Sequence, residues 1–369
     1  MKINYFVGLI CLIVFLGSCN TTQNAPVEVV SVAGEDTQIV NPVVITDTTL
    51  NDTDDPAIWI NKADPSKSLV IGTDKGDSTG GIFVFNLEGK LDKSKSIYNL
   101  KRPNNIDIEY DFGYNGKTID IAVFTERGRN MIRVCSLPDM KFIDNGGIEV
   151  FVGDTLRDPM GISLYKDPES TKVYAIVGRK TGPNGSYLWQ YELETTSDGV
   201  TAKKVREFGR FSGKKEIESI VVDDELGYIY YSDETAGVRQ YYASPDRGNQ
   251  ELALFATSGI TSDHEGLSIY PTSKNTGYII LSDQQANKFQ IFRREGDSGN
   301  PYHHPLIKVV RVAAMESDGS DVTVNYLNST FKHGLFVAMS TDKTFHFYRW
   351  EDIAGENSGT VNSAQVIRQ

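Results

Sequence analysis

Cysteine and histidine are both scarce in this chain of 369 residues. Two of its three cysteines, Cys11 and Cys19, lie within the first twenty residues, which leaves Cys135 alone in the rest of the chain. A lone cysteine cannot form an internal disulfide, so the fold does not depend on one. With five histidines and no HExxH or CxxC spacing, the sequence also argues against a zinc site.

Basic residues are outnumbered as well. The chain has 37 lysines and arginines against 49 aspartates and glutamates, a formal net charge of −12 at pH 7. Because a protein that binds nucleic acid needs a basic face, we exclude nucleic acid as a partner. A hydrophobic content of 39%, with 18 Tyr and 17 Phe, indicates a globular protein rich in β-strands. The acidic excess is the feature that needs a physical explanation.

A long apolar run is found at the N-terminus, from Phe6 to Leu16, and nowhere else in the sequence. This run is too short to span a bilayer and is typical of a secretion signal. The letters LGSC at residues 16–19 resemble the bacterial lipoprotein box, in which the cysteine becomes the lipidated N-terminus. We therefore predict a signal peptide over residues 1–18 and lipidation of Cys19. The alternative is a plain signal peptide with a chance cysteine.

The mature chain predicted from this signal is an exported lipoprotein. Loss of Lys2 leaves 36 basic against 49 acidic residues, a net charge of −13. Residues 19–43 lack a clear hydrophobic period, and we expect them to form a flexible tether. Because Asn20 is not the Asp-type signal that retains lipoproteins at the inner membrane, the outer membrane is the expected location, on its periplasmic or its cell-surface side. The lipid is the expected membrane contact.

One local pattern recurs six times along the rest of the chain. Each copy has a short apolar strand, a polar turn and an aromatic-rich strand, and the copies begin at Leu69, Ile119, Val173, Tyr228, Tyr278 and Leu335. A period of fifty-odd residues is typical of a propeller blade, whereas helical repeats need a 3.6-residue apolar period and a β-sandwich shows no regular repeat. We predict an all-β fold over residues 44–369, a six-bladed β-propeller with four-stranded antiparallel blades around a central channel.

Acidic residues open most of the strands that precede these copies. The aligned positions are Asp55, Asp107, Glu218, Glu265 and, in the sixth copy, Asp318 or Asp321, with Met160 in the third. Equivalent positions of propeller blades point to the same end of the channel, so we expect a ring of carboxylates around one mouth. Like charges held this close raise one another's pKa values unless a cation neutralises them, and Ca²⁺ suits an irregular ring of oxygen ligands.

The turns of the same copies carry complementary charges. The first three copies have basic turn residues, which are Lys75, Arg127, Arg179 and Lys180. The last three have Asp233-Glu234, Asp283-Gln284 and Thr341-Asp342. The pattern predicts a mouth with a basic half and an acidic half, which together could hold a phosphate from two sides. The alternative is that the lysines and arginines are ordinary polar turn residues.

At this point the sequence resembles a known family, the calcium-dependent β-propeller phytases. The resemblance rests on DDPAIWI at residues 54–60, NNIDIEYDF at 104–112, SDHEGLSIY at 262–270 and SDGSDV at 317–322, and it covers about residues 44–355 in order. It implies a phosphoric monoester hydrolase of the 3-phytase class. Such an enzyme removes phosphate from phytate, which is myo-inositol hexakisphosphate, with a water activated by several Ca²⁺ ions.

The resemblance also implies roles for individual residues. It assigns the phosphate contacts to Lys75, Arg127 and Lys180, with Arg179 beside them. It assigns ligation of calcium to Asp55, Asp107, Glu218, Glu234, Asp263 and Glu265, to which Asn105, Gln284 and Asp318 are added. The catalytic set is Lys75, Arg127, Lys180, Glu218 and Glu234. Two positions depart from the family: Met160 replaces an expected tyrosine hydroxyl, and Thr181 replaces an expected glutamate.

These departures leave other functions open. A non-catalytic propeller at the cell envelope could capture phosphorylated ligands or a partner in a calcium-dependent way, and Met160 and Thr181 motivate that alternative. Another metal-dependent hydrolase, such as a lactonase, is a third possibility, but a lactone gives the basic turn residues nothing to bind. The expected partners are phytate or related inositol phosphates, and a monomer is expected.

Overall fold

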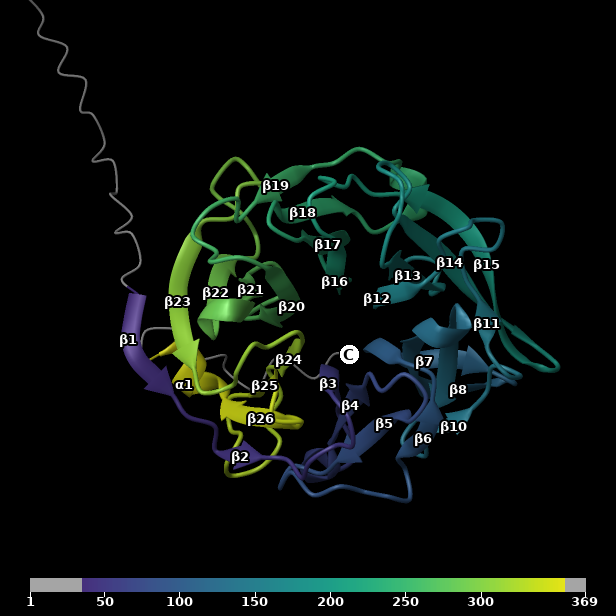
Figure 1. Ribbon diagram of the computed structural model, residues 1–369, viewed down its shortest axis with the longest axis horizontal. Coiled ribbons are helices and arrows are strands. Elements are labelled where there is room, and N and C mark those ends of the chain that lie inside the picture. Colours follow the sequence, from purple (N-terminus) through teal and green to yellow (C-terminus); the bar gives the residue numbers. More distant parts are fainter. Residues whose placement is uncertain (1–34, 356–369) are drawn as a thin grey trace, which may run out of the picture. The chain divides into compact units, whose positions relative to one another are not determined.

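Six β-sheets form a ring in the computed structural model, which describes residues 35–355 (Figure 1). Each sheet is a blade built on four antiparallel strands, ordered from the axis to the rim (Figure 1). The innermost strand of each blade contacts the innermost strands of both neighbouring blades, which closes the ring. The prediction of an all-β, six-bladed propeller is confirmed.

The first three blades follow in chain order. Blade 1 contains β3 (Thr53–Trp59), β4 (Leu69–Asp74), β5 (Gly80–Phe85) and β6 (Ile97–Leu100). Blade 2 contains β7 (Pro103–Tyr114), β8 (Lys117–Glu126), β9 (Met131–Ser136) and β10 (Lys141–Phe142), with β11 (Ile148–Glu149) also paired to β9. Blade 3 contains β12 (Pro159–Lys166), β13 (Val173–Arg179), β14 (Leu188–Thr196) and β15 (Gly199–Phe208).

The last three blades complete the ring. Blade 4 contains β16 (Ile217–Asp223), β17 (Tyr228–Asp233), β18 (Gly237–Tyr242) and β19 (Ala253–Phe255). Blade 5 contains β20 (His264–Pro271), β21 (Gly277–Asp283), β22 (Lys288–Arg293) and β23 (Leu306–Val312). Blade 6 contains β24 (Ser320–Thr323), β25 (Leu335–Ser340) and β26 (Thr344–Arg349). Each of the six repeats seen in the sequence begins in the second strand of a blade and continues into the third.

Two strands from the N-terminal side join the last two blades. β2 (Val44–Ile45) pairs antiparallel with β26 and supplies the fourth strand of blade 6. β1 (Glu35–Val40) pairs parallel with β23 at the rim of blade 5. The predicted boundary at residue 44 therefore differs from the structure, because part of the expected tether covers an otherwise open strand edge. The predictions for the signal peptide and Cys19 lie outside the described residues.

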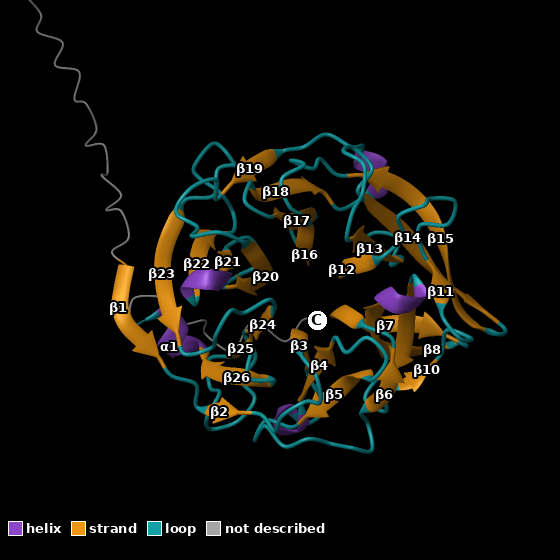
Figure 2. Ribbon diagram, viewed as in Figure 1, coloured by secondary structure: helices purple, strands orange, loops and turns teal. Residues whose placement is uncertain are grey.

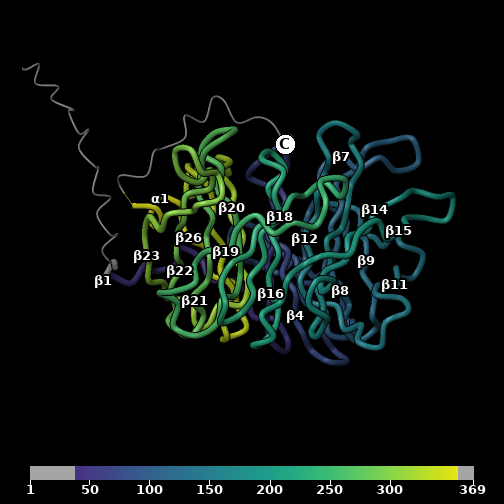
Figure 3. The backbone as a smooth tube through the Cα atoms, turned by 90° about the horizontal axis from the view of Figure 1, so that it is seen from above, coloured from purple at the N-terminus to yellow at the C-terminus, as the bar shows by residue number. Residues whose placement is uncertain are grey.

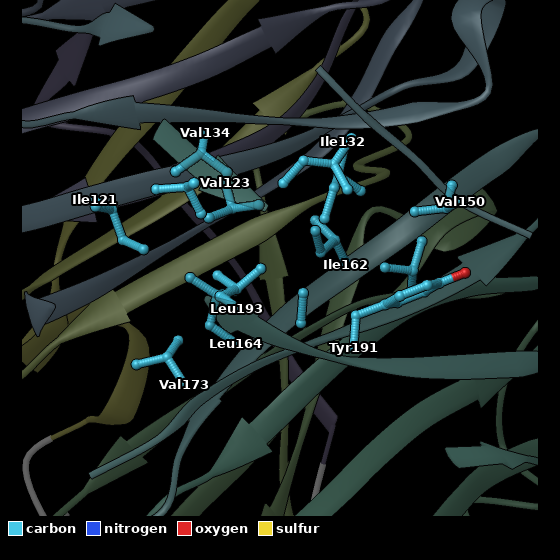
Figure 4. Packing of buried hydrophobic residues seen from close by; sticks show 14 of the residues in the cluster. Ile121, Val123, Ile132, Val134, Val150, Ile162, Leu164, Val173, Tyr191 and Leu193 are labelled. Atoms are coloured by element: carbon cyan, nitrogen blue, oxygen red, sulfur yellow. The ribbon is translucent and has the colours of Figure 1, made fainter. Parts of the chain in front are cut away.

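Apolar side chains fill the space between neighbouring blades. Between blades 2 and 3, Val123 and Val134 lie opposite Ile162 and Leu164 in one buried cluster (Figure 4). Because both faces of each blade are covered in this way, the second strands are continuous apolar runs: all six residues of β4 are buried. This explains why the second strands were the clearest repeat in the sequence.

Helical structure is limited to short segments (Figure 2). Within residues 35–355 the one α-helix is α1 (Trp350–Ala354), whose Trp350 stacks on Tyr270 of blade 5 with 3.8 Å between ring centroids. No helix in this part of the chain has the length and apolar character needed to cross a membrane. Turned by 90°, the strands run between two faces of the ring, where loops and turns gather (Figure 3). One of these faces carries the candidate site.

Candidate functional site

The strand register is interrupted at the same place in five blades. In β3, β7, β12, β16 and β20, regular pairing with the second strand skips between the first and the fourth residue. Irregularities of this kind re-aim side chains at strand ends. The second residue of each strand lies within the irregular segment, and Asp318 has the same spacing before Ser320 in blade 6. We call this the ring position; its residues are Asp54, Asn104, Met160, Glu218, Glu265 and Asp318.

Two residues expected in the ring occupy other positions. Asp55 lies one residue beyond the ring position, where its carboxylate accepts a hydrogen bond from Ile106 N at 3.2 Å. Asp107 lies three residues beyond it and accepts hydrogen bonds from Ser163 Oγ at 2.8 Å and Leu164 N at 2.7 Å. Both carboxylates therefore tie their own blade to the next one. From the sequence, Asp55 and Asp107 were aligned with the ring position by their distance from the turn. That distance is not constant, because the first two strands differ in length between blades.

The first residue after the second strand is also equivalent in all six blades. We call it the turn position, and its residues are Lys75, Arg127, Lys180, Glu234, Gln284 and Thr341. Apart from Arg179, the turn residues assigned from the sequence to phosphate or calcium thus belong to one structural position. Charge changes around it, with three basic residues in blades 1 to 3 and one acidic and two uncharged residues in blades 4 to 6.

The residue just before the turn position has a different task, which is to hold the loop that enters the blade. Asp74 accepts hydrogen bonds from the backbone N–H groups of Leu50 at 2.8 Å and Asn51 at 2.7 Å. Asp283 likewise accepts one from Thr261 N at 2.9 Å. These contacts fix the backbone on which the ring and turn positions are mounted.

Arg179 occupies this loop-holding position in blade 3, where it donates hydrogen bonds to the loop instead of accepting them. Its guanidinium is buried, pairs with Asp154, and donates hydrogen bonds to Leu156 O at 3.1 Å and Ser186 O at 2.8 Å. It also lies 4.5 Å from the centroid of the Phe151 ring. The sequence predicted a phosphate contact here, but the structure places Arg179 in the framework, where both of its terminal nitrogens already donate to groups of the protein.

The basic half of the mouth is connected by hydrogen bonds. Lys75 Nζ lies 2.5 Å from Asp318 Oδ2 and 3.3 Å from Asp54 Oδ1. Asn104 donates to Asp54 at 2.6 Å and accepts from Arg127 at 3.2 Å. Burial disfavours the ammonium of Lys75, but the charges of Asp54 and Asp318 raise its pKa above the ordinary value. Lys75 therefore stays charged, and Arg127 is oriented by an uncharged amide.

The acidic half gathers carboxylates from blades 4 and 5. Two groups have oxygens within 4.8 Å of one another, and they share Glu234: the first is Glu216, Glu218 and Glu234, and the second is Glu234, Asp263 and Glu265. Four of these five residues were candidates from the sequence. Glu216 was missed, although it lies two residues before Glu218, a spacing that puts two side chains on one face of a strand.

Burial and repulsion perturb these carboxylates. Burial, together with the charges of neighbouring carboxylates, raises the pKa of both Glu218 and Glu265 well above the ordinary value. Burial also raises the pKa of Glu234 to about 7, and Glu234 Oε1 is buried without a hydrogen-bond partner. A buried carboxylate oxygen without a donor is costly unless a cation satisfies it. The donor set contains only oxygen, which fits a hard divalent ion such as Ca²⁺.

Lysines from the protein supply part of the missing positive charge. Lys180 of the turn position pairs with Glu216. Lys215 was not expected from the sequence, and its Nζ lies 2.5 Å from Glu234 Oε2 and 2.7 Å from Asp263 Oδ2. Burial acts to raise the pKa of Asp263, but the hydrogen bond and charge of Lys215 bring it below the ordinary value.

The remaining candidates complete the ring. Gln284 donates a hydrogen bond to Asp318 and so joins blades 5 and 6. Met160 fills the ring position of blade 3 and is 2% exposed, while Thr181 is exposed. Asn105, one residue beyond the ring position, has a buried Oδ1 without a hydrogen-bond partner. Sequence reasoning missed Asp54 and Asn104, although each is the direct neighbour of a residue that it named.

Several known proteins are similar to this chain. The family model described as Phytase matches residues 11–356. A 3-phytase of Bacillus subtilis (strain 168) is 31% identical over 322 residues, which cover 82% of this chain and 80% of that protein. Among solved structures, that of the Dos1 propeller aligns with a TM-score of 0.42 and 10% identity, over 84% of this chain and 70% of that one.

Proposed function

The chain belongs to the phytase family and is an enzyme of the 3-phytase class, and from this premise we propose that it releases phosphate from phytate in a calcium-dependent reaction. The observation that carries the proposal is the position of Glu234. This buried residue is shared by two groups of carboxylates and occupies the same turn position as Lys75, Arg127 and Lys180. Cation ligands and anion-binding side chains therefore come from equivalent points of one ring.

The carboxylates divide into two places for a cation. Glu216, Glu218 and Glu234 would hold one Ca²⁺, and Glu234, Asp263 and Glu265 would hold another. Ca²⁺ bound there would neutralise charge on a phosphate and lower the pKa of a bound water. The protein's own contribution is to hold several carboxylates together and largely shielded from water, at the cost of a mutual repulsion that raises their pKa values.

The basic side chains would bind and orient the substrate. Arg127 presents a planar fork of donors that matches two phosphate oxygens, and Asn104 fixes its direction. Lys75 is held between Asp54 and Asp318, so its ammonium is positioned before the substrate arrives. Preorganised charge of this kind lowers the reorganisation needed when a phosphoryl group is transferred.

This arrangement would account for part of the acidic excess. A protein with net charge −12 repels a polyanion at long range. Part of that charge is concentrated in the two carboxylate groups, where it would recruit cations that reverse the local field. The sign of the net charge is therefore a poor guide to the sign of the substrate.

The central experiment is a phosphate-release assay on the mature protein. After treatment with a chelator, phytate hydrolysis should be absent, and it should return as Ca²⁺ is raised from micromolar to millimolar. Mg²⁺ at the same concentrations is the control for a less specific cation effect. Absence of release at every Ca²⁺ concentration would overturn the proposal. Calcium-dependent phytate binding in calorimetry without any release would instead indicate the non-catalytic binding propeller.

The cellular location is a separate part of the proposal. We propose that Cys19 anchors the enzyme to the outer membrane as an exported lipoprotein, based on the apolar run and the LGSC letters before the mature chain. Cells fed labelled palmitate should incorporate the label into the wild-type protein but not into the Cys19→Ala variant. Equal labelling of both proteins would show that another residue, or none, is lipidated.

A further inference from the structure

One lysine lies inside the second carboxylate group rather than beside it. Lys215 precedes β16 by two residues, and its Nζ contacts Glu234 Oε2 at 2.5 Å and Asp263 Oδ2 at 2.7 Å. These two side chains, with Glu265, form the second carboxylate group described above. The ammonium therefore uses carboxylate oxygens that a divalent cation would need.

An ammonium and a divalent ion exclude each other at this place. Both require the same oxygens, and their positive charges repel at such short separation. The side chain of Lys215 is 46% exposed, while that of Glu234 is 1% exposed. A flexible lysine stem can carry its charge into water, where an ammonium is strongly hydrated, but the buried glutamate cannot follow it.

Lys75 shows by contrast what a fixed lysine looks like in this site. Its side chain is 20% exposed and has three carboxylates within 4 Å, those of Asp52, Asp54 and Asp318. None of these three belongs to the two carboxylate groups that would hold cations. Lys75 can thus remain in place when a cation binds, whereas Lys215 cannot.

We infer that Lys215 is a built-in counter-cation that occupies the second carboxylate group in the metal-free protein and must be displaced when Ca²⁺ binds. Lys215 then stabilises the metal-free state and lowers the Ca²⁺ affinity, because its own ion pairs are lost on binding. Its role is to position charge and to set the cation concentration at which the enzyme loads. This inference rests on the proposed function, since it takes the second group as a calcium site.

The test compares Ca²⁺ binding to wild type and to Lys215→Met, which removes the charge and keeps the apolar stem. Calorimetry on chelator-treated protein should show about tenfold tighter binding at one site of the variant. Thermal unfolding should show a lower Tm than wild type in chelator and a larger rise in Tm on addition of Ca²⁺. A lysine with a purely structural role would lower the Tm equally with and without Ca²⁺.

Two further variants serve as controls. Lys214→Met removes the neighbouring charge in the same loop, where Nζ donates to the Thr235 carbonyl and not to a carboxylate, so Ca²⁺ affinity should stay near wild type. Lys215→Arg keeps a positive charge and should also bind Ca²⁺ with near wild-type affinity.

Two outcomes contradict different statements. If Lys215→Met binds Ca²⁺ no more tightly than wild type, or more weakly, the inference is wrong while the calcium site itself stands. If wild-type protein binds no Ca²⁺ in the same titration, the proposed function fails first.

Discussion

Blades 1 to 3 and blades 4 to 6 place opposite chemistry on the same backbone. At the turn position the first three blades carry Lys75, Arg127 and Lys180, whereas Glu234 heads the corresponding turn of blade 4. The ring position shows the contrast less strictly. Blades 2 and 3 carry uncharged Asn104 and Met160, and blades 4 and 5 carry buried Glu218 and Glu265, but blade 1 carries the acidic Asp54. The propeller thus repeats its framework and varies the side chains that the framework presents.

The two halves also differ in how their charges are satisfied. In the basic half each cation has a polar partner within the protein, such as the Asn104 amide for Arg127. In the acidic half the carboxylates outnumber the available lysines, and Glu234 Oε1 is buried without a donor. The protein itself therefore neutralises the charges of the basic half, whereas the acidic half has an excess of carboxylates, which agrees with the proposed binding of cations there. Four substitutions test this contrast, in three steps ordered by their expected effect on turnover.

The largest effect is expected at Glu218, in the acidic half. Glu218→Gln keeps the shape of the side chain but removes one negative charge from the first carboxylate group. Because the amide is a weaker ligand and leaves the bound cation less neutralised, we expect phosphate release to fall about 100-fold or more. Initial rates at saturating phytate, with Ca²⁺ calorimetry beside them, measure the effect.

The matched control is Glu169→Gln. Glu169 is an exposed carboxylate in the loop between β12 and β13, away from the mouth. This substitution removes the same charge from the protein and should leave both the rate of phosphate release and the Ca²⁺ affinity unchanged. An undiminished rate in Glu218→Gln would mean that the ring of carboxylates does not hold the reactive cation.

A substitution in the basic half should change KM for phytate rather than Ca²⁺ affinity. Arg127→Gln removes a guanidinium that is held by Asn104 and has no contact with the two carboxylate groups. Loss of one charge-assisted contact to phosphate should raise KM about tenfold, with Ca²⁺ affinity near wild type. Steady-state kinetics over a range of phytate concentrations separates the two parameters. A weakened Ca²⁺ affinity with unchanged KM would contradict the division into two halves.

The sequence predicted the framework better than the ring. The second strands were recognisable because burial on both faces makes them continuous apolar runs, as in β4. Turn residues such as Lys75 were assigned to the correct position because they follow those strands directly. Asp55 and Asp107 were wrongly aligned with the ring position. Interrupted pairing and unequal strand lengths mean that a fixed number of residues before the turn does not lead to the same point in every blade. Lys215 was missed because its contacts depend on how a loop of blade 4 meets blade 5.

The smallest effect on turnover is expected from substitutions of the neighbours Arg179 and Lys180. Because both residues lie in blade 3, comparing them also tests the framework against the site within one half. Arg179→Met removes a buried guanidinium that serves Leu156 O, Ser186 O and Asp154, so unfolding in denaturant should show a loss of about 2–3 kcal/mol. Turnover per folded molecule should change little, because this side chain is 1% exposed and faces the framework. Lys180→Met should do the reverse, raising KM with little change in stability, since its side chain is 44% exposed. Equal losses of stability in both variants would show that the turn position is framework too, and the contrast between the halves would then rest on the carboxylates alone.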